Sequence, residues 1–225
     1  MVNIKISIHN RNLESRKQAL MEWKIPEKEK KYLLKFLEDL ELGKVNKGIK
    51  ITEARQIKYL DIIKTPLEFF NKLSNKLTLK DIEKFDKELS SNKLKSYKKT
   101  PFADSTKVDM KRTLKIYLKW RLGDKARKLT DWFDLRIKRK TPDYLSEQEV
   151  TKVYKSCKSA EERFLIAVLF DSGARAEEFH NIRYEDIQLP TEKEGYVKLT
   201  LKEEYSKTKG RVISLYWKYS LEAVR

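Results

Sequence analysis

Four lysines recur at strict four-residue intervals in the predicted helix at residues 105–122, and this row could bind a polyanion. The row consists of Lys107, Lys111, Lys115 and Lys119, with Arg112 beside it. Residues four apart share one helix face, and Met110, Leu114 and Tyr117 form the adjoining apolar stripe. Ammonium groups presented in this way can contact phosphates and release condensed counterions, with little base specificity. The pattern predicts binding to a nucleic-acid backbone, and an ordinary solvated helix face is the alternative.

Positive charge is concentrated in the first 140 residues. The formal net charge is +17, but residues 1–140 hold 37 Lys and Arg against 19 Asp and Glu, whereas residues 141–225 hold 14 against 15. A lysine-rich bias of the whole proteome would not stop at one boundary, so the break favours a polyanionic partner. The basic residues that flank the row are Lys93, Lys95, Lys98 and Lys99 before it and Lys138, Arg139 and Lys140 after it.

Several kinds of site are disfavoured by composition. The single cysteine, Cys157, excludes an internal disulfide framework and a cysteine metal cluster, and His9 and His180 are too few and too far apart to indicate zinc. The N-terminus MVNIKISIHN lacks an apolar signal region, and no run approaches the roughly 18 apolar residues of a membrane span. We therefore expect no metal, no membrane partner, and a cytoplasmic or nucleoid-associated protein.

The segment around the lysine row is predicted to be helical from about residue 27 to 135. Its predicted helix starts and stops are Pro26, Gly43, Thr52, Thr65-Pro66, Thr78 with Asp81, and Ser105 or Thr106 with Gly123. The run DLRIKRKTPDYL is basic and contains Thr-Pro, which favours an extended linker at the charge break. We expect an N-terminal extension or arm with the first helix at 1–45, a helical core DNA-binding domain at 46–135, a basic linker at 136–145, and a second domain at 146–225.

The second domain is predicted to mix helices with a small sheet. Ser146 with Glu149 forms a capping box, FLIAVLF predicts a buried helix that ends near Gly173, and AEEFHNI predicts a short helix. GYVKLTL and RVISL are typical of strands, and the basic segment between them predicts a β-hairpin with a basic tip. The final SLEAVR is typical of a helix cut off in its second turn. The expected fold is mainly α, with a small antiparallel hairpin or sheet in an incomplete α+β domain.

Residues 172–189, SGARAEEFHNIRYEDIQL, resemble the first motif box of the tyrosine recombinase, or phage integrase, family. In that box a glycine, one residue and an arginine are followed three positions later by glutamate, then by a short helix and Asp-Ile. YLSEQEV is similar to the start of the family's catalytic domain, and SKTKGRVISL to its lysine-bearing hairpin. TLKDIEKFDKEL and STKVDMKRTLKIYLKW are similar to its helical core-binding domain. The resemblance covers roughly residues 50–225 and implies a SAM-like core-binding domain followed by part of a catalytic domain.

The resemblance also implies roles for single residues. Strand exchange passes through a charged, pentavalent phosphorus, so hydrogen-bond donors must point at its non-bridging oxygens. Arg175 matches the arginine that binds the scissile phosphate, and Glu178 would brace it. Lys207 matches the general acid that protonates the departing 5′ oxygen, with Lys209 as a rival and an additional DNA contact. Taken alone, an ordinary surface pair of Arg175 with Glu178 and a basic hairpin tip are the alternatives.

Other parts of that family's site are not found in residues 1–225. No His-x-x-Arg follows the hairpin, and His180 with Arg183 lies inside the first box instead. Phe179 stands where the family usually has leucine. The tyrosines that come too early to be the nucleophile are Tyr205, Tyr216 and Tyr219. We therefore expect the C-terminal part of the catalytic domain, with the nucleophile, to be missing from this chain.

Three functions are compatible with these patterns. The first is a site-specific DNA recombinase or integrase that forms a 3′-phosphotyrosyl intermediate without metal or cofactor, and that is inactive as the chain stands. The second is a non-catalytic DNA-binding fragment of a split or decayed integrase. The third is an RNA-binding helical protein, which would explain the charge but not the ordered matches. The resemblance implies duplex DNA as partner and, for the complete enzyme, a homo-tetramer on two duplexes.

Overall fold

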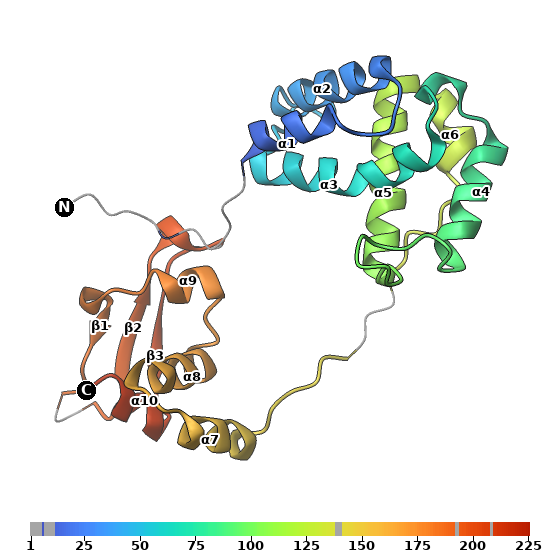
Figure 1. The fold of residues 1–225 in the computed structure, drawn as a ribbon. Helices are drawn as coiled ribbons and strands as arrows, with labels where there is room; N and C mark the ends of the chain where they lie inside the picture. Colours follow the sequence, from blue (N-terminus) through green and yellow to red (C-terminus); the bar gives the residue numbers. More distant parts are fainter. Residues whose placement is uncertain (1–5, 7–11, 138–140, 192–193, 208) are drawn as a thin grey trace. The chain divides into compact units, whose positions relative to one another are not determined.

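The computed structural model describes residues 6, 12–137, 141–191, 194–207 and 209–225. The chain divides into two compact units (Figure 1): the described residues 12–137 form a helical unit, and Ile6 with the described residues from Thr141 onward forms an α/β unit. Each unit has its own hydrophobic core. Four residues considered above lie outside the described part of the chain, namely His9, Lys138, Arg139 and Lys140.

The helical unit begins and ends its helices largely where local signals predict. Its elements are α1 (Leu13–Leu20), α2 (Glu27–Glu41), α3 (Glu53–Phe70), the 3-10 helix η1 (Ser74–Lys76), α4 (Leu79–Ser90), α5 (Asp104–Leu122) and α6 (Lys125–Thr130). Thr78 and Asp81 form the predicted capping box at the start of α4. Gly43 follows α2 with a φ of +79°, where an added Cβ would come within 2.6 Å of the Gly48 carbonyl oxygen. Only glycine fits this turn.

Helix α3 is continuous, so the predicted helix start at Thr65-Pro66 is wrong. A proline inside a helix removes one backbone hydrogen bond and crowds the preceding turn, at a cost of about 3 kcal/mol. Pro66 is nevertheless buried, as are Ile63 and Leu67 on either side of it, and α3 packs against α5. Burial of each large aliphatic side chain contributes roughly 1.5–3 kcal/mol. Packing along α3 therefore outweighs the local helix-breaking signal.

The first two helices are part of the same core as the rest of the helical unit. The side chains that α1 and α2 bury almost completely are Leu20, Leu33, Phe36, Leu37 and Leu40. They belong to one cluster with Leu60 of α3 and Leu114 of α5. The sequence left open whether residues 1–45 form an arm or pack inward, and the structure packs their helices inward.

A buried carboxylate joins α2 to η1 and α5. Glu29 is fully buried, and its Oε1 accepts the Tyr117 hydroxyl at 2.7 Å. Its Oε2 accepts the Ser74 backbone N–H at 3.0 Å and the Ser74 hydroxyl at 3.3 Å. Burial and the nearby Glu29 carboxylate raise the pKa of Tyr117, so its hydroxyl remains a hydrogen-bond donor. The network couples segments that lie far apart in the sequence.

We expect Glu29→Ala to lower the free energy of unfolding of the helical unit by about 2–4 kcal/mol, because it leaves buried donors without an acceptor. Urea unfolding followed by circular dichroism measures this loss. Glu38→Ala on the same helix is the matched control, because the Glu38 side chain is 62% exposed. A similar loss in both variants would contradict a special role for Glu29.

The α/β unit places short helices against a three-stranded antiparallel sheet of order β1-β2-β3 (Figure 1). Its elements are α7 (Glu147–Ser156), α8 (Ala160–Ser172), α9 (Ala176–His180), the 3-10 helix η2 (Tyr184–Asp186), β1 (Ile187–Gln188), β2 (Val197–Leu201), the 3-10 helix η3 (Glu203–Tyr205), β3 (Arg211–Leu215) and α10 (Lys218–Ala223). Val197, Leu199 and Leu201 alternate along β2 and are fully buried. The expected mainly α fold with a small antiparallel sheet is confirmed at this level.

Helix α8 is less buried than its sequence predicts. FLIAVLF indicated a helix buried on all sides, but only Ala167 and Val168 are fully buried, while Leu165 and Phe170 are 37% and 40% exposed. Among the described residues, α8 packs mainly against α7, α10 and β3, so part of its surface faces outward. None of the helices in the described ranges combines the length and apolar content needed to cross a membrane.

Candidate functional site

The buried carboxylate of Glu178 holds Arg175 in place at the start of α9. Glu178 is 1% exposed, and its Oε2 accepts the Arg175 backbone N–H at 2.9 Å. Its Oε1 accepts Nη1 of the Arg175 guanidinium at 2.8 Å. The three-residue spacing allows both bonds, because the first turn of a helix brings the third residue beneath the residue that caps it. Arg175 and Glu178 are therefore brought together as predicted from the motif.

Two residues from the hairpin bind the same carboxylate. The Ser206 hydroxyl donates to Oε1 at 2.6 Å, and the Arg211 guanidinium donates to Oε1 at 3.1 Å and to Oε2 at 2.9 Å. The sequence reasoning missed both partners, which lie 28 and 33 positions beyond Glu178. No spacing rule connects residues so far apart. We call Arg175, Glu178, Ser206 and Arg211 the Glu178 cluster.

The cluster keeps its central carboxylate charged. The guanidinium of Arg211, the Ser206 hydroxyl and both groups of Arg175 hold the pKa of Glu178 well below its ordinary value of 4.5, and Arg211 has the largest effect. The same contact raises the pKa of Arg211. The Arg175 side chain is still 49% exposed, and among the described residues its other guanidinium N–H groups have no partner. An arginine held in this way can donate a fork of hydrogen bonds to an anion.

The predicted general acids lie on the segment that follows Ser206. The Ser206 hydroxyl and the Arg175 Nη1 both bind Glu178 Oε1, so they lie within two hydrogen-bond lengths of each other. Lys207 is the next residue, and both Lys207 and Lys209 are exposed. In the described part of the chain neither lysine forms an ion pair. The structure brings the start of this segment next to Arg175 and does not distinguish Lys207 from Lys209.

A second buried carboxylate fixes the start of the hairpin connection. Asp186 is 2% exposed and accepts the Arg183 backbone N–H at 3.0 Å, the Tyr205 hydroxyl at 3.2 Å and the Lys202 ammonium at 2.8 Å. Burial raises the pKa of Tyr205. A buried tyrosine that donates to a carboxylate is poorly placed to act as a nucleophile, and this agrees with the sequence argument against Tyr205.

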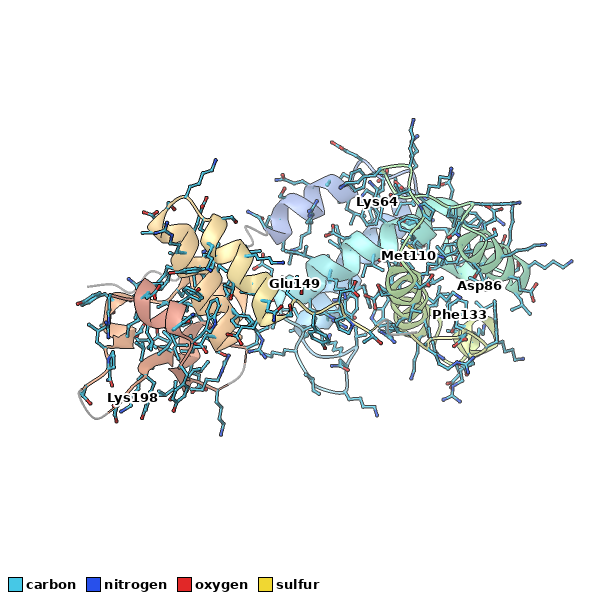
Figure 2. The ribbon with its side chains drawn as sticks, turned by 90° about the horizontal axis from the view of Figure 1, so that it is seen from below. Lys64, Asp86, Met110, Phe133, Glu149 and Lys198 are labelled. Atoms are coloured by element: carbon cyan, nitrogen blue, oxygen red, sulfur yellow. The ribbon has the colours of Figure 1, made fainter. Side chains whose placement is uncertain are left out.

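The predicted lysine row on α5 is not a continuous surface. Lys111 is 9% exposed and pairs with Asp86 of α4, the helix that carries the Asp86 label in Figure 2. Lys115 pairs with Asp131 at 2.8 Å. Lys107 pairs with Asp104 at 3.2 Å, and its side chain is 15% exposed. The prediction that the row presents four free ammonium groups is therefore corrected, because three of them are paired with aspartates.

Helix geometry explains why the row is interrupted. A four-residue repeat drifts around a helix of 3.6 residues per turn, so successive members cannot all keep the same environment. Lys111 directly follows buried Met110 and is drawn against α4. Arg112 donates to Asp109 at 3.3 Å and to the Leu135 carbonyl at 3.4 Å. Lys119 is the exposed member of the row, and it forms no ion pair among the described residues.

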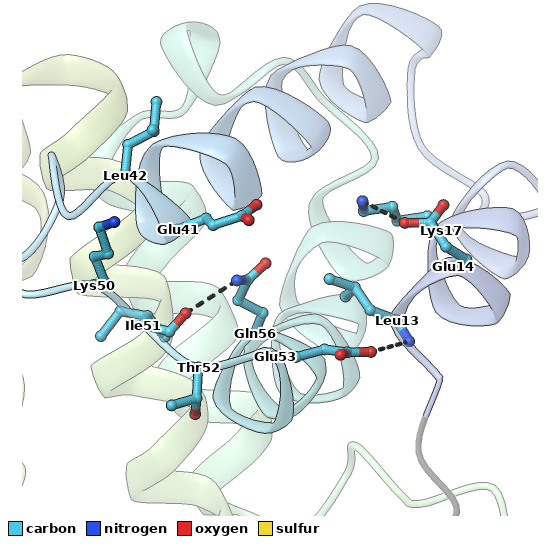
Figure 3. Close-up of a pocket in the computed structure, with 10 residues that line it drawn as sticks. All are labelled: Leu13, Glu14, Lys17, Glu41, Leu42, Lys50, Ile51, Thr52, Glu53 and Gln56. Atoms are coloured by element: carbon cyan, nitrogen blue, oxygen red, sulfur yellow. Dashed lines mark hydrogen bonds and ion pairs between the residues drawn. The ribbon is translucent and has the colours of Figure 1, made fainter.

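The hollow between α1, the end of α2 and the start of α3 does not suit a phosphate. Figure 3 shows this cavity of about 560 Å³, which contains the carboxylates of Glu14, Glu41 and Glu53. Glu53 accepts the Leu13 backbone N–H at 2.9 Å, and Glu14 accepts the Lys17 ammonium at 2.7 Å. Carboxylates repel a polyanion. In the described ranges no three or more His, Cys, Asp and Glu side chains form a cluster able to hold a metal ion.

Comparisons with known proteins give a partial sequence match to one tyrosine recombinase and do not establish family membership. No protein-family model matches the chain. Over 138 residues it is 24% identical to the tyrosine recombinase XerA of Saccharolobus solfataricus, a match that covers 58% of this chain and 45% of that protein. A crystal structure of XerA recombinase aligns with 86% of this chain and 61% of the solved chain, at 21% identity and a TM-score of 0.32. The chain thus matches less than half the length of its curated relative.

We expect Glu178→Gln to destabilise the α/β unit by about 3 kcal/mol at pH 7, because two guanidinium groups lose their shared counter-charge. Because the pKa of Glu178 is lowered, its charge stabilises the folded state. This stabilisation is fully present above about pH 4.5 and is lost as the pH falls. The difference in the free energy of unfolding between wild type and variant should therefore narrow by about 1.4 kcal/mol for each pH unit below that value. Urea unfolding between pH 3 and 7 measures this difference.

Hydrogen exchange and a matched control variant locate that effect. Hydrogen exchange at pH 7 should show lost protection in β2 and β3 for Glu178→Gln, because the cluster ties α9 to the hairpin. Glu204→Gln is the matched control, since Glu204 is an exposed glutamate at the same hairpin. If the difference in unfolding free energy does not change with pH, or if both variants lose the same protection from exchange, the Glu178 cluster does not tie α9 to the hairpin.

If the chain binds DNA, as its sequence predicts, we expect Lys111→Met to leave the salt dependence of that affinity unchanged, because the ammonium group is already paired inside the helical unit. Each phosphate contact that is truly lost lowers the slope of log affinity against log salt by about one. Fluorescence anisotropy at a series of salt concentrations gives this slope. If the slope falls by about one for Lys111→Met, Lys111 does contact a DNA phosphate.

Proposed function

We propose that this chain binds duplex DNA and presents Arg175 and a hairpin lysine to a backbone phosphate, as in strand exchange by tyrosine recombinases. The observation that carries the proposal is the Glu178 cluster, which holds the open side of the Arg175 guanidinium beside the segment that begins at Lys207. The order of the sequence motifs and the partial match to a tyrosine recombinase support it. The charge of residues 1–140 supports a polyanionic partner.

In the proposed reaction, these residues act on a phosphodiester that is attacked by a tyrosine oxygen, whose proton passes to solvent. A bond forms between the tyrosine oxygen and phosphorus, the bond from phosphorus to the 5′ oxygen breaks, and the product is a 3′-phosphotyrosine with a free 5′ hydroxyl. Arg175 donates to the non-bridging oxygens, where one well-placed donor is worth about 3–4 kcal/mol of transition-state stabilisation. Lys207, or Lys209 in its place, gives the proton that the departing 5′ oxygen takes up. None of the tyrosines in residues 1–225 is assigned as the nucleophile.

The helical unit would supply most of the affinity for the duplex as a core-binding domain. Its contacts to phosphates would be largely independent of base sequence, because lysines read the backbone charge. Assembly into a tetramer on two duplexes is part of the same proposal for the complete enzyme. A cytoplasmic, nucleoid-associated location would follow from such a partner.

Non-catalytic binding to duplex DNA is the second candidate. The specific observation in its favour is that the positive charge of the sequence is concentrated in residues 1–140, outside the unit that carries Arg175. In that case the Glu178 cluster would still bind a phosphate, and the chain would hold DNA without cleaving it. Covalent trapping separates this candidate from the enzyme.

Arg175→Ala tests the proposed phosphate site on nicked duplexes of varied sequence. In a protein that contains this chain together with a tyrosine nucleophile, we expect the variant to form covalent complexes with DNA about 100–1,000-fold more slowly, because one oxyanion donor is lost. Duplex affinity should change less than about threefold. Denaturing gels score the covalent product, and Arg163→Ala, an exposed arginine of the same unit, is the matched control.

The outcomes distinguish the candidates. Covalent product that persists in Arg175→Ala would overturn the assignment of Arg175. Duplex binding without any covalent product, by a protein that contains this chain together with a tyrosine nucleophile, would favour the non-catalytic candidate. Equal affinity for unrelated double-stranded RNA at matched salt would count against both and favour an RNA-binding protein.

A further inference from the structure

The connection between α4 and α5 is a closed loop rather than an extended tail. We call residues 91–101 the basic loop. Lys95 and Pro101 form an isolated antiparallel bridge, the Ser96 N–H donates to the Thr100 carbonyl at 2.9 Å, and the Lys99 N–H donates to the Ser96 carbonyl at 2.8 Å. The Ser96 and Thr100 hydroxyls share a further bond of 2.9 Å. These bonds hold Lys99 at a φ of +60°, which costs a non-glycine residue roughly 1–2 kcal/mol.

The basic loop carries only positive charge. Its charged residues are Lys93, Lys95, Lys98 and Lys99, all of them exposed, and the loop contains no Asp or Glu. In contrast to three lysines of α5, none of the four forms an ion pair with any described residue. Tyr97 is 90% exposed, and the Lys98 ammonium lies 5.7 Å from the centre of its ring. Four like charges in one closed turn repel one another until an anion neutralises them.

The apolar hollow beside the loop is not the site of that anion. It has a volume of about 600 Å³, and its floor includes Phe69, Phe102 and Met110. Asp61 and Glu68 of α3 also line it. Lys64 and Lys95 line it as well, but a phosphate there would meet both carboxylates and an apolar floor. The exposed ammonium groups of the loop offer a more favourable surface for a polyanion.

We propose that the basic loop, rather than the α5 row, is the main phosphate-binding element of the helical unit, and that its partner is the backbone of duplex DNA. The inference rests on the proposed function and names the part of the chain that makes the contact. Lysines without fixed partners contact phosphates independently of base sequence. The single aromatic residue, Tyr97, is too little for a platform that stacks successive unpaired bases. Its hydroxyl donates to a phosphate oxygen.

The test compares two charge-matched variants of the full chain. The first replaces Lys93, Lys95, Lys98 and Lys99 of the basic loop with glutamine. The control replaces four other exposed lysines of the helical unit, Lys24, Lys28, Lys31 and Lys47, with glutamine. Both variants lose the same net charge, so any difference reports local contacts. Circular dichroism checks that both remain folded, as expected for exposed side chains.

Fluorescence anisotropy on duplex DNA at a series of salt concentrations gives affinity and salt slope. We expect the loop variant to lose about three units of slope and at least 100-fold in affinity at about 0.1 M salt, and the control to lose less than about one unit. Tyr97→Phe, which removes only the hydroxyl, should weaken binding about threefold to tenfold.

Three results would overturn the inference. If wild type binds duplex DNA and the loop variant loses no more slope than the control, the basic loop is not the interface and the proposed function stands. If single strands of equal length bind as tightly with the same dependence on the loop, duplex DNA is the wrong partner. If wild type binds no duplex at any salt concentration, the proposed function fails and this inference fails with it.

Discussion

The geometry of the candidate site depends on one buried charge. A carboxylate that is 1% exposed must be compensated, because an unpaired charge in that position costs several kcal/mol. For Glu178 the compensation comes from its own helix start, from the middle of the hairpin connection and from the first residue of β3, through Arg175, Ser206 and Arg211. Buried ion pairs add little net stability compared with apolar packing, but they fix relative position. Here they fix a guanidinium next to the segment that carries Lys207 and Lys209.

Interactions between residues that lie within about four positions of each other could be predicted from the sequence. The capping boxes at Thr78 and Ser146 and the pairing of Arg175 with Glu178 depend only on helix geometry, which spacing reveals. Strand alternation likewise predicted the hairpin. Ser206 and Arg211 could not be found in this way, because chain folding alone brings them to Glu178. The family resemblance pointed to the hairpin without indicating what holds it.

Periodicity failed where packing decides the outcome. It could not show that α3 continues through Pro66, because the compensating burial comes from another helix. It placed four lysines on one face of α5 but could not show that acidic groups outside the row would pair with them. Asp86 on α4 and Asp131 after α6 lie 25 positions before and 16 positions after their partners Lys111 and Lys115. The burial of α8 was overestimated for the same reason, since an apolar run does not say how many elements will cover it.

Net charge therefore has to be separated into cations that hold the fold together and cations that remain available to a partner. Lys111 and Lys115 stabilise contacts within the helical unit, whereas the lysines of the basic loop have no such partner among the described residues. In the α/β unit, with almost no net charge in its sequence, the available donors include the open side of Arg175 and the exposed Lys207 and Lys209. Long-range attraction depends on summed charge, while phosphoryl chemistry depends on a few aimed donors. A chain with this division would hold DNA mainly through one unit and orient a phosphate through the other, and only the first contribution would weaken steeply with salt.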